Sequence, residues 1–360
     1  MTKQFHIWAA GDSHVGTDIR RGRTSLADAL RQSEGDGGSE PFDWDIMLDV
    51  GDLSGSQGPP DDHEGQLVHE QYAVLKKHRR EQIYNILGNH DASGPDEDTQ
   101  WWFRKYVDPT GESTATSGID PARRPFAVDG TWERYKVEVG NVVILMMGDR
   151  NDGGPPVGRG ARGGYPAGAV TGETFDWWVE QVEANADRII ISVHHHMLKA
   201  TTVGSGEWEG FTGPLDRYGR REGHYHGYFR DGGPMGSGYL YWVDGNPDAQ
   251  AFERYLESHP GAIDLWIGGH THTFPGDIKN GRGHIERKWG VTFLNCAAMT
   301  KYHINAPSRA TPMSRPLTLT EGGASMTIRC YLHTSDFAPQ GFDAPQHRVV
   351  PLRHAFRHPG

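Results

Sequence analysis

Residues 82–91 read QIYNILGNHD, an apolar run that stops at Gly88 and gives way to three polar side chains. A short apolar run closed by a turn signal is typical of a buried β-strand. The sequence therefore predicts a strand over residues 82–87, followed at once by the tripeptide Asn89–Asp91. An amide, an imidazole and a carboxylate offered together at one strand end can bind a metal ion or move a proton.

The same order, a buried strand and then a polar cluster, recurs along the chain. The clusters are Asp12-Ser13-His14 after residues 5–10, Gly51-Asp52 after residues 44–50, His194-His195-His196 after residues 188–193, and Gly269-His270-Thr271-His272 after residues 265–268. In open α/β sheets, ligand sites gather at the carboxyl ends of the strands. Histidines scattered through a core would not each follow directly after a strand, so we expect the clusters to form one site.

Strands alternate with segments of helical periodicity, which favours a layered α/β fold. The predicted helices cover residues 24–33, 64–80, 173–186 and 249–259. We expect one catalytic domain over residues 1–335, in which residues 201–245 form a long irregular insertion near the mouth of the site. Residues 336–360 are expected to be a C-terminal tail.

The composition limits the partners of the chain. Acidic residues exceed basic ones by 47 to 36, for a net charge of -11, and such a chain is a poor general binder of nucleic acid or anionic membranes. The 48 glycines and the apolar fraction of 36% indicate long loops around a compact centre. Because there are only two cysteines, no visible signal peptide and no run of about 18 apolar residues, we expect a cytoplasmic protein that does not enter a membrane.

Together these clusters resemble the sequence blocks of the calcineurin-like metallophosphoesterases. That family's blocks read Asp-x-His, Gly-Asp, Gly-Asn-His-Asp or Glu, a histidine after a strand, and Gly-His-x-His, and all five occur here in that order between residues 12 and 272. The resemblance implies an αββα sandwich with two metal ions in one site. A mixed nitrogen and oxygen ligand set suits manganese, iron, zinc or cobalt.

The resemblance also implies which residues bind the ions. One ion would be held by Asp12, His14, Asp52 and His272, and the other by Asp52, Asn89, His270 and one histidine of the run 194–196. We favour His194, because family members tend to show His-x-Pro followed by two apolar residues, and Met197 and Leu198 lie at that spacing. His196 stands where proline is common, so His195 stays open as an alternative ligand. If it is not a ligand, His195 is expected to contact the substrate.

The reaction that the resemblance implies is hydrolysis of a phosphodiester or phosphomonoester, in which a metal-bridging hydroxide attacks phosphorus in line. His90 would stabilise charge on the phosphoryl oxygens and donate a proton to the leaving oxygen. Asp91 would hold the imidazole of His90 in one tautomer. The expected partner is a small phosphate-ester substrate.

Two features bear on the branch of the family and on the substrate. The purple acid phosphatase branch has a tyrosine three residues after the bridging aspartate, where this chain has Gly55, so the arrangement looks closer to the cyclic-nucleotide and glycerophosphodiester phosphodiesterases. Arg220 and Arg221 in the insertion are expected to grip a substrate phosphate. The alternatives are a nuclease on the same site, which the acidic charge disfavours, and a scaffold without catalysis, which the intact Asn89–Asp91 block disfavours.

Overall fold

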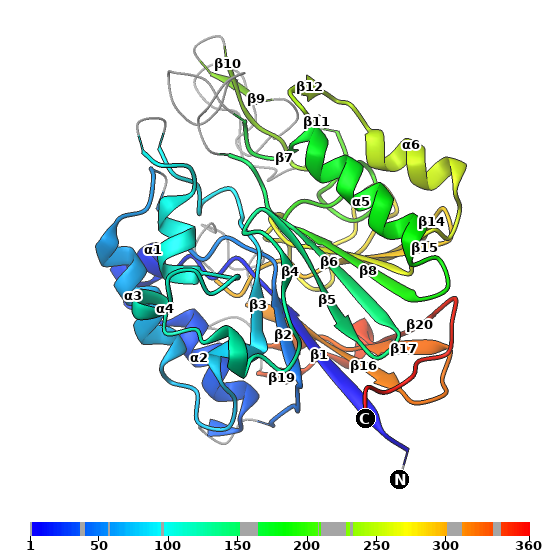
Figure 1. The fold of residues 1–360 in the computed structure, drawn as a ribbon, viewed down its shortest axis with the longest axis horizontal. Coiled ribbons are helices and arrows are strands. Elements are labelled where there is room, and N and C mark those ends of the chain that lie inside the picture. Colours follow the sequence, from blue (N-terminus) through cyan, green and yellow to red (C-terminus); the bar gives the residue numbers. More distant parts are fainter. Residues whose placement is uncertain are drawn as a thin grey trace.

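Two β-sheets lie face to face in the middle of the molecule, and helices cover their outer faces (Figure 1). This computed structural model describes residues 2–36, 40–56, 58–94, 97–151, 165–207, 209, 228–230, 233–300, 312–333 and 340–360. The N- and C-terminal ends lie near each other at one end of the sandwich (Figure 1).

The first sheet has the strand order β19-β18-β16-β1-β2-β3, with β17 and β20 joined to it through β16. Its strands are β1 (Gln4–Ala10), β2 (Ile46–Asp49), β3 (Ile83–Asn85), β16 (Met313–Thr320), β17 (Ser325–Ile328), β18 (Tyr331–Leu332), β19 (Gly341–Phe342) and β20 (Arg348–Pro351). Strands β1, β2 and β3 are parallel, whereas β16 runs antiparallel to β1. Residues 340–360, which lie within the segment expected to be a tail, therefore supply two strands to this sheet.

The second sheet has the order β14-β15-β13-β8-β6-β5-β4. Its strands are β4 (Asp129–Gly130), β5 (Arg134–Val139), β6 (Val142–Met147), β8 (Ile189–His194), β13 (Leu265–Gly268), β14 (Ile285–Lys288) and β15 (Val291–Asn295). Strands β6, β8, β13 and β15 are parallel to one another. Five shorter strands form two small sheets: β7 (Ala169–Val170) with β11 (Trp242–Val243) and β12 (Asn246–Pro247), and β9 (Tyr228–Arg230) with β10 (Gly233–Gly236).

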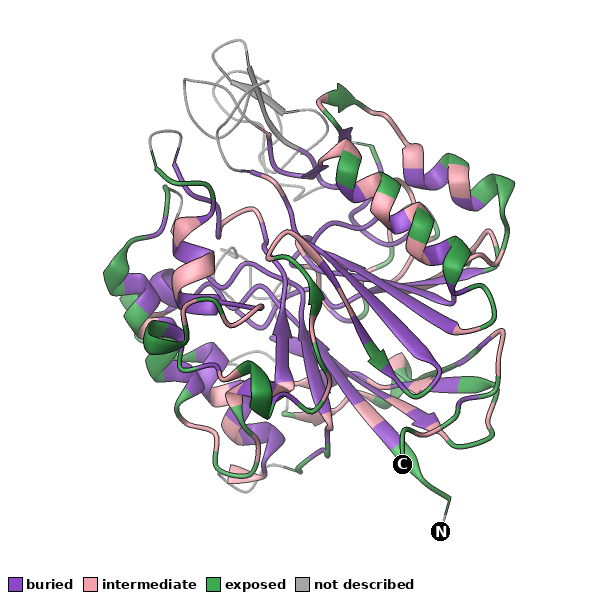
Figure 2. Cartoon of the chain, in the orientation of Figure 1, coloured by how far each residue is buried: buried purple, intermediate pink, exposed green. Residues whose placement is uncertain are grey.

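The buried side chains form three main layers that follow this arrangement. One apolar cluster fills the space between the two sheets, with Ile7 and Leu48 from the first and Ile144 and Ile191 from the second. A second cluster joins the first sheet to α1 (Val15–Arg20), α2 (Ser25–Ser33) and α3 (Asp62–Tyr72). A third joins the second sheet to α5 (Gly172–Ala184) and α6 (Ala251–Ser258). The predicted αββα sandwich is thus confirmed, and Figure 2 shows buried strands between helices that are exposed on their outer sides.

The remaining helical elements are short. They are α4 (Thr114–Ser117), the 3-10 turns η2 (Arg80–Gln82), η4 (Pro121–Arg123) and η5 (Ala344–Gln346), and the π-helical turn η3 (Phe103–Val107). Within the described residues, no helix is long and apolar enough to cross a membrane.

Local sequence accounts for most of the element boundaries. The turn between β5 and β6 is formed by Gly140, which adopts a φ of 57°, and Asn141, a pair typical of two-residue hairpin turns. Helix α5 begins after Thr171, whose side chain accepts a hydrogen bond from the backbone N–H of Thr174.

One predicted helix is wrong in length. The sequence predicts a helix over residues 64–80, but α3 ends at Tyr72. The carboxylate of Glu34 accepts hydrogen bonds from the backbone N–H groups of residues 76, 77 and 78, at 2.9–3.0 Å. A buried acid from a distant segment therefore holds this stretch outside the helix, which periodicity within the stretch could not reveal.

Candidate metal centre

The carboxyl ends of the parallel strands of both sheets meet at one edge of the sandwich. The backbone N–H of His270, after β13, donates to Asp12 Oδ2 at 3.0 Å, and His195 Nδ1, after β8, lies 2.7 Å from the carbonyl oxygen of Val50, after β2. The backbone N–H of Met299, beyond β15, donates to the carbonyl of Gly11 at 2.9 Å. The predicted clusters therefore face one another across the seam between the sheets.

Five of the predicted site residues have a left-handed backbone. The φ angles are 54° at Asp12, 45° at His14, 58° at Asp52, 68° at His270 and 29° at His272. For residues other than glycine this region is sparsely populated and costs about 1–3 kcal/mol per residue. Such strain collected at one place points to a site in which side-chain direction matters more than local stability.

Glycines next to these residues allow the loops to approach closely. A Cβ added to Gly88 would collide with the backbone N and the carboxylate of Asp52. One added to Gly269 would collide with the carboxylate of Asp12 and lie 3.0 Å from Val50 Cγ2. In these two blocks the glycine is therefore required by contact with a carboxylate from another block.

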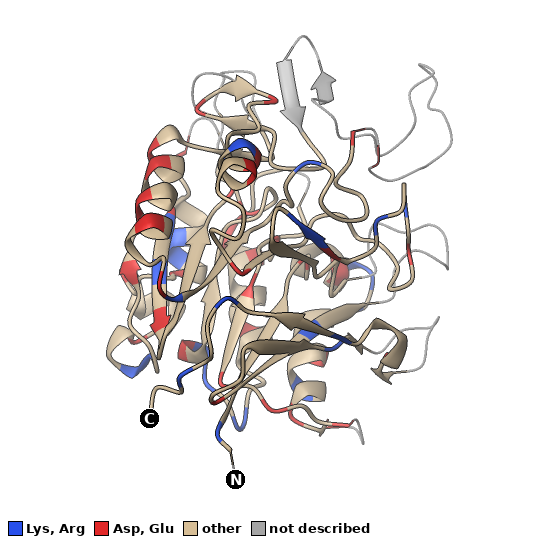
Figure 3. Ribbon diagram, turned by 90° about the vertical axis from the view of Figure 1, so that its right-hand side faces the viewer, with Lys and Arg blue, Asp and Glu red and all other residues tan. Residues whose placement is uncertain are grey.

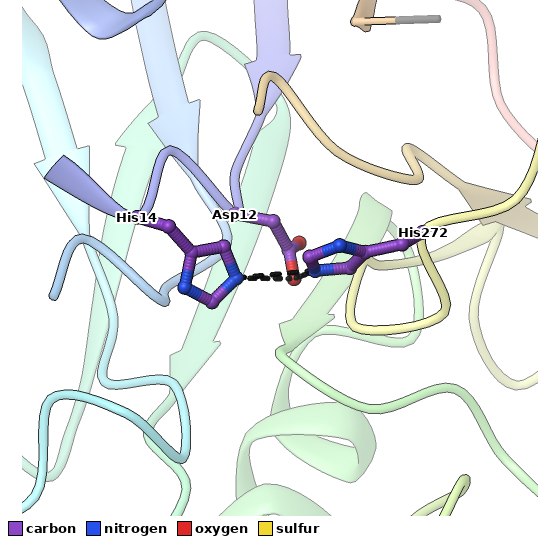
Figure 4. Close-up of side chains that lie close together, drawn as sticks. All are labelled: Asp12, His14 and His272. Atoms are coloured by element: carbon purple, nitrogen blue, oxygen red, sulfur yellow. Dashed lines mark hydrogen bonds and ion pairs between the residues drawn. The ribbon is translucent and has the colours of Figure 1, made fainter. Parts of the chain in front are cut away.

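Side chains that can bind metals converge into three overlapping groups at this edge. The groups are Asp12, His14 and His272; His14, Asp52 and His90; and Asp52, His195 and His270, with the ligand atoms of each group within 4.8 Å of one another. Figure 4 shows the first group, in which His272 Nε2 lies 3.0 Å from Asp12 Oδ1 and 3.1 Å from His14 Nε2. Asp52 belongs to two groups, and its carboxylate has two oxygens with which to serve both.

The structure brings His195, and not the favoured His194, to Asp52 and His270. His195 Nε2 lies 3.2 Å from Asp52 Oδ2. The backbone N–H of His196 donates to His194 Nδ1 at 3.0 Å, and His194 Nε2 lies 4.0 Å from Asp149 Oδ1. Both ring nitrogens of His194 are thus directed away from the three groups, and the alternative that the sequence leaves open is the one that the geometry favours.

Three imidazoles of the centre share one hydrogen-bonding pattern. His195 Nδ1 lies 2.7 Å from the carbonyl of Val50, His14 Nδ1 lies 3.0 Å from that of Ser54, and His90 Nδ1 lies 2.7 Å from that of Ser56. Because a carbonyl oxygen only accepts, each Nδ1 carries a hydrogen, and in the neutral ring each Nε2 keeps a lone pair that a metal ion can use. This arrangement is found around metal-binding histidines. In the neutral ring it leaves His195 Nε2 and Asp52 Oδ2, which lie 3.2 Å apart, as two possible ligand atoms for one ion.

The electrostatics of the centre also favour a cation. Burial, the largest influence, raises the pKa of Asp12 well above its ordinary value, although His195 lowers it. Burial would raise the pKa of Asp52 too, but the imidazoles of His195, His90 and His14 hold it well below its usual range. Burial would lower the pKa of His195, yet Asp52 and Asp12 raise it to about 10. The buried carboxylates therefore draw positive charge, which a divalent ion supplies more fully than a proton.

Asp91 does not contact the imidazole of His90, contrary to the expected role. Asp91 Oδ2 accepts from the backbone N–H groups of Asp52 and Gly88, at 2.9 and 2.8 Å, and Oδ1 accepts from that of Ser54 at 2.8 Å. The carbonyl of Ser56 occupies His90 Nδ1 instead. Asp91 therefore joins the loop after β2 to the loop after β3. The position of His90 depends on the loop after β2, which contains Ser56.

Asn89 and His90 are half-buried, and His90 belongs to one of the three groups, so both residues lie at the accessible side of the centre. The backbone carbonyl of Asn89 accepts from Asn151 Nδ2 at 2.7 Å, and the backbone N–H of His90 donates to Asp52 Oδ1 at 2.8 Å. Asn151 holds the block after β3 from the other sheet and was not anticipated from the sequence.

Asp149 is a second residue that sequence reasoning missed. Its Oδ1 accepts from the backbone N–H groups of Gly168 and Ala169, at 2.8 and 2.9 Å, and lies 3.5 Å from His196 Nδ1. The ring of His196 in turn lies 4.0 Å from that of His270. Burial raises the pKa of Asp149 to about 7, although His195 lowers it. The sequence does contain a signal for Asp149, because Gly148-Asp149 follows an apolar strand just as Gly51-Asp52 does.

The predicted substrate-binding residues Arg220 and Arg221 lie outside the described residues, as do residues 208, 210–219, 222–227 and 231–232 of the 201–245 insertion.

No family model matches the chain, and no curated protein matches it in sequence. Solved structures do resemble it. They include a dimetal phosphatase from Danio rerio (TM-score 0.48, 12% identity, 96% of this chain and 98% of that chain). GAP50, the anchor in the inner membrane complex of Plasmodium, gives a TM-score of 0.45 at 9% identity over 98% of this chain and 90% of that chain. Vacuolar protein sorting 29 from Cryptosporidium parvum gives 0.34 at 12% identity over 97% and 98%. Because all three TM-scores are below 0.5, the function proposed below rests on the residues of the site.

Proposed function

We propose that this chain is a phosphoesterase of the calcineurin-like metallophosphoesterase type, which hydrolyses a small phosphodiester or phosphomonoester with two metal ions. The observation that carries the proposal is the place of Asp52, which belongs to the group with His14 and His90 and to the group with His195 and His270. A carboxylate shared between two sets of imidazoles is suited to join two ions in one centre.

The ligand sets follow from these groups. Asp12, His14, Asp52 and His272 would hold one ion, and Asp52, Asn89, His195 and His270 would hold the other. Bound there, the ions would polarise a phosphoryl oxygen and lower the pKa of a water molecule towards neutral pH. Manganese, iron and zinc each accept such a mixture of imidazole and carboxylate ligands.

The protein's own part in the reaction is to orient and to transfer a proton. His90 is half-buried, and its Nδ1–H is fixed by the carbonyl of Ser56, so Nε2 is the ring nitrogen that can meet the substrate. In its protonated form this nitrogen would donate a hydrogen bond to a phosphoryl oxygen or a proton to the leaving oxygen. Asn89, beside it, offers an uncharged carbonyl oxygen that does not repel the substrate's negative charge.

The charge distribution favours a small ester over nucleic acid. The chain carries a net charge of -11, and in Figure 3 Lys and Arg of the described residues are interspersed with Asp and Glu. A nucleic-acid backbone is usually met by a clustered basic surface. We therefore propose that the anionic substrate is attracted locally, by the ions, and that it is small enough to need no extended basic groove.

The test is hydrolysis of bis-p-nitrophenyl phosphate and p-nitrophenyl phosphate by protein that has been stripped with a chelator and then loaded with manganese. Metal content is measured by mass spectrometry on the same samples. We expect about two ions per chain and ester hydrolysis that needs them. Asp52→Asn should lose most of the metal and about 100-fold or more of the rate. His90→Ala should keep the metal and lose about 100-fold of the rate.

The matched control is His63→Ala, because His63 is an exposed histidine on α3 that belongs to none of the three groups. It should behave as the unaltered protein does. Metal bound without hydrolysis of either ester would point to a binding scaffold, whereas no metal in any loaded sample would contradict the whole proposal. The ratio of diester to monoester turnover then decides the branch.

A further inference from the structure

The segment Val50–Ser56 supports the candidate centre through its backbone. Its carbonyl groups at Val50, Ser54 and Ser56 accept from the Nδ1–H groups of three histidines that belong to three different sequence blocks. A shift of this segment would turn several imidazoles together. Whatever fixes its backbone therefore fixes the direction of the Nε2 lone pairs.

Glu64, on the first turn of α3, fixes that segment from the side. Its Oε1 accepts from the backbone N–H of Gly55 at 2.6 Å and from Ser54 Oγ at 3.1 Å, and its Oε2 accepts from Ser56 Oγ at 2.6 Å. Glu64 is only 5% exposed, and no Lys or Arg within the described ranges forms an ion pair with it. Its carboxylate accepts hydrogen bonds from residues 54–56, and the carbonyls of Ser54 and Ser56 accept from His14 and His90.

The placement of Glu64 is not explained by its helix. Asp61 is the N-cap of α3, and its side chain accepts from the backbone N–H of Glu64 at 2.9 Å. An N-cap aspartate with glutamate three residues later has the spacing of a capping box, in which the glutamate would reach back to the N-cap N–H. The carboxylate of Glu64 instead accepts hydrogen bonds from residues 54–56, before the helix. Glu64 therefore contacts the segment that supports the centre rather than the N-cap N–H of its own helix.

Neighbouring packing fits the same role. A Cβ added to Gly16, in α1, would lie 2.6 Å from Glu64 Cδ and Oε1, so the side chain is enclosed between α1 and the segment. His14 immediately precedes α1, which places Glu64 against both the backbone that carries His14 and the carbonyl that orients it.

We infer that Glu64 is a positioning residue of the proposed metal centre, one that sets metal affinity by holding residues 54–56 and, through them, the imidazoles of His14 and His90. The inference rests on the proposed function. Glu64 belongs to none of the three metal-binding groups, and its carboxylate bonds to residues 54–56. Its loss should therefore act first on how tightly the centre binds metal and only then on turnover.

The experiment is a manganese titration of metal-free protein, with bound metal measured by equilibrium dialysis, for Glu64→Ala, Glu64→Gln and the unaltered chain. We expect Glu64→Ala to raise the apparent Kd for manganese about 10- to 100-fold. Glu64→Gln keeps the shape and an acceptor for the Gly55 N–H, and the serine hydroxyls can rotate to accept from its amide, so it should stay within about threefold of the unaltered chain. Glu70→Ala is the matched control, since Glu70 is an exposed glutamate on the same helix.

Thermal unfolding of the metal-free proteins separates positioning from folding. A weaker Kd in Glu64→Ala at an unfolding temperature equal to that of Glu64→Gln supports the inference. If Glu64→Ala fails to fold, Ser56→Ala removes the hydrogen bond from Ser56 Oγ to Glu64 and should weaken manganese binding about three- to tenfold. A folded Glu64→Ala that binds manganese as the unaltered chain does would overturn the role of Glu64 alone, whereas an unaltered chain that binds no manganese would overturn the proposed function with it.

Discussion

The Nε2 atoms of His14 and His272 lie 3.1 Å apart, although 258 residues separate them in the chain. His14 follows β1 of the first sheet and His272 follows β13 of the second, so the pair closes the seam between the sheets. The carbonyl of Ser54 accepts from His14 Nδ1–H, and His14 Nε2 therefore brings a lone pair to the contact. Two imidazoles that approach in this way, with Asp12 Oδ1 3.0 Å from one of them, offer ligand atoms for one side of a metal site.

The first prediction follows from that pair. His272→Ala should reduce manganese from about two ions to about one per chain, because His272 belongs to the Asp12 and His14 group but not to that of His195 and His270. Metal content after dialysis against a fixed low manganese concentration measures it. Retention of both ions at unaltered affinity would exclude His272 from the ligands.

The second prediction separates the two adjacent histidines after β8. His195→Gln should weaken the binding of one ion about 100-fold, since His195 Nε2 lies 3.2 Å from Asp52 Oδ2. His194→Gln should leave affinity within about tenfold, because His194 Nδ1 is taken by the backbone N–H of His196. Manganese titrations of the two variants, side by side, decide between them. The reverse order of effects would restore His194 as the ligand.

The third prediction concerns the glycine of the block after β3. Gly88→Ala should cost about 1–3 kcal/mol of stability and most of the metal affinity, because the new Cβ would displace the carboxylate of Asp52. Gly276→Ala is the control, since nothing lies within 4 Å of the Cβ that it would add. Urea unfolding and metal content give the two readouts. A stable, metal-loaded Gly88→Ala protein would show that the two loops can separate without harm.

The fourth prediction is a pH dependence of stability that does not involve the centre. His333 is buried, with Nδ1 2.9 Å from Gln32 Oε1 and Nε2 2.8 Å from Ser314 Oγ, and burial lowers its pKa to about 3. Between the ordinary value near 6.5 and about 3, the unfolded chain binds a proton at this residue and the folded chain does not. The free energy of unfolding should therefore fall as the pH falls through that window, by about 1.4 kcal/mol per pH unit from His333.

Removal of the ring tests this dependence. His333→Gln should reduce the slope of stability against pH between pH 6 and about 4 by roughly that amount, whatever it does to stability at pH 7. The exposed His347→Gln variant should leave the slope as it was. Urea unfolding at several pH values measures the slopes. Equal slopes in the unaltered and His333→Gln proteins would mean that His333 takes up its proton without unfolding.

A layered α/β fold could be predicted from the sequence because its parallel strands are short apolar runs that end in polar blocks, and the αββα arrangement was implied by the family resemblance of those blocks. The antiparallel strand β16 was missed. It contains Pro316, which argues against a strand in a sheet interior, and it begins directly after residues that gave no pattern. Pro316 pairs with Trp8 of β1, and the carbonyl of Pro316 accepts from the backbone N–H of Arg329 at 2.8 Å, an acceptor role that proline retains.

The candidate centre was anticipated in its members more fully than in their roles. The polar blocks at the strand ends pointed to Asp12, Asp52 and the histidines, and the family resemblance implied that they bind metal ions. The sequence could not assign the role of Asp91, because a carboxylate next to a histidine in the sequence can accept from three backbone N–H groups instead of contacting the imidazole. The sequence also could not choose between His194 and His195. The direction of His194 depends on the backbone N–H two residues further on, and that of His195 depends on the carbonyl of Val50, which follows a strand of the other sheet.

The left-handed backbone at Asp12, His14, Asp52, His270 and His272 has a consequence for anyone who re-engineers this chain. Glycine adopts such φ angles without strain, so a procedure that scores sequences by folded-state stability alone would choose glycine at each of these positions. Every such choice would be favourable for the backbone, and together they would erase the carboxylates and imidazoles of the candidate centre. A thermostable redesign must therefore hold these five residues fixed and seek its gains elsewhere.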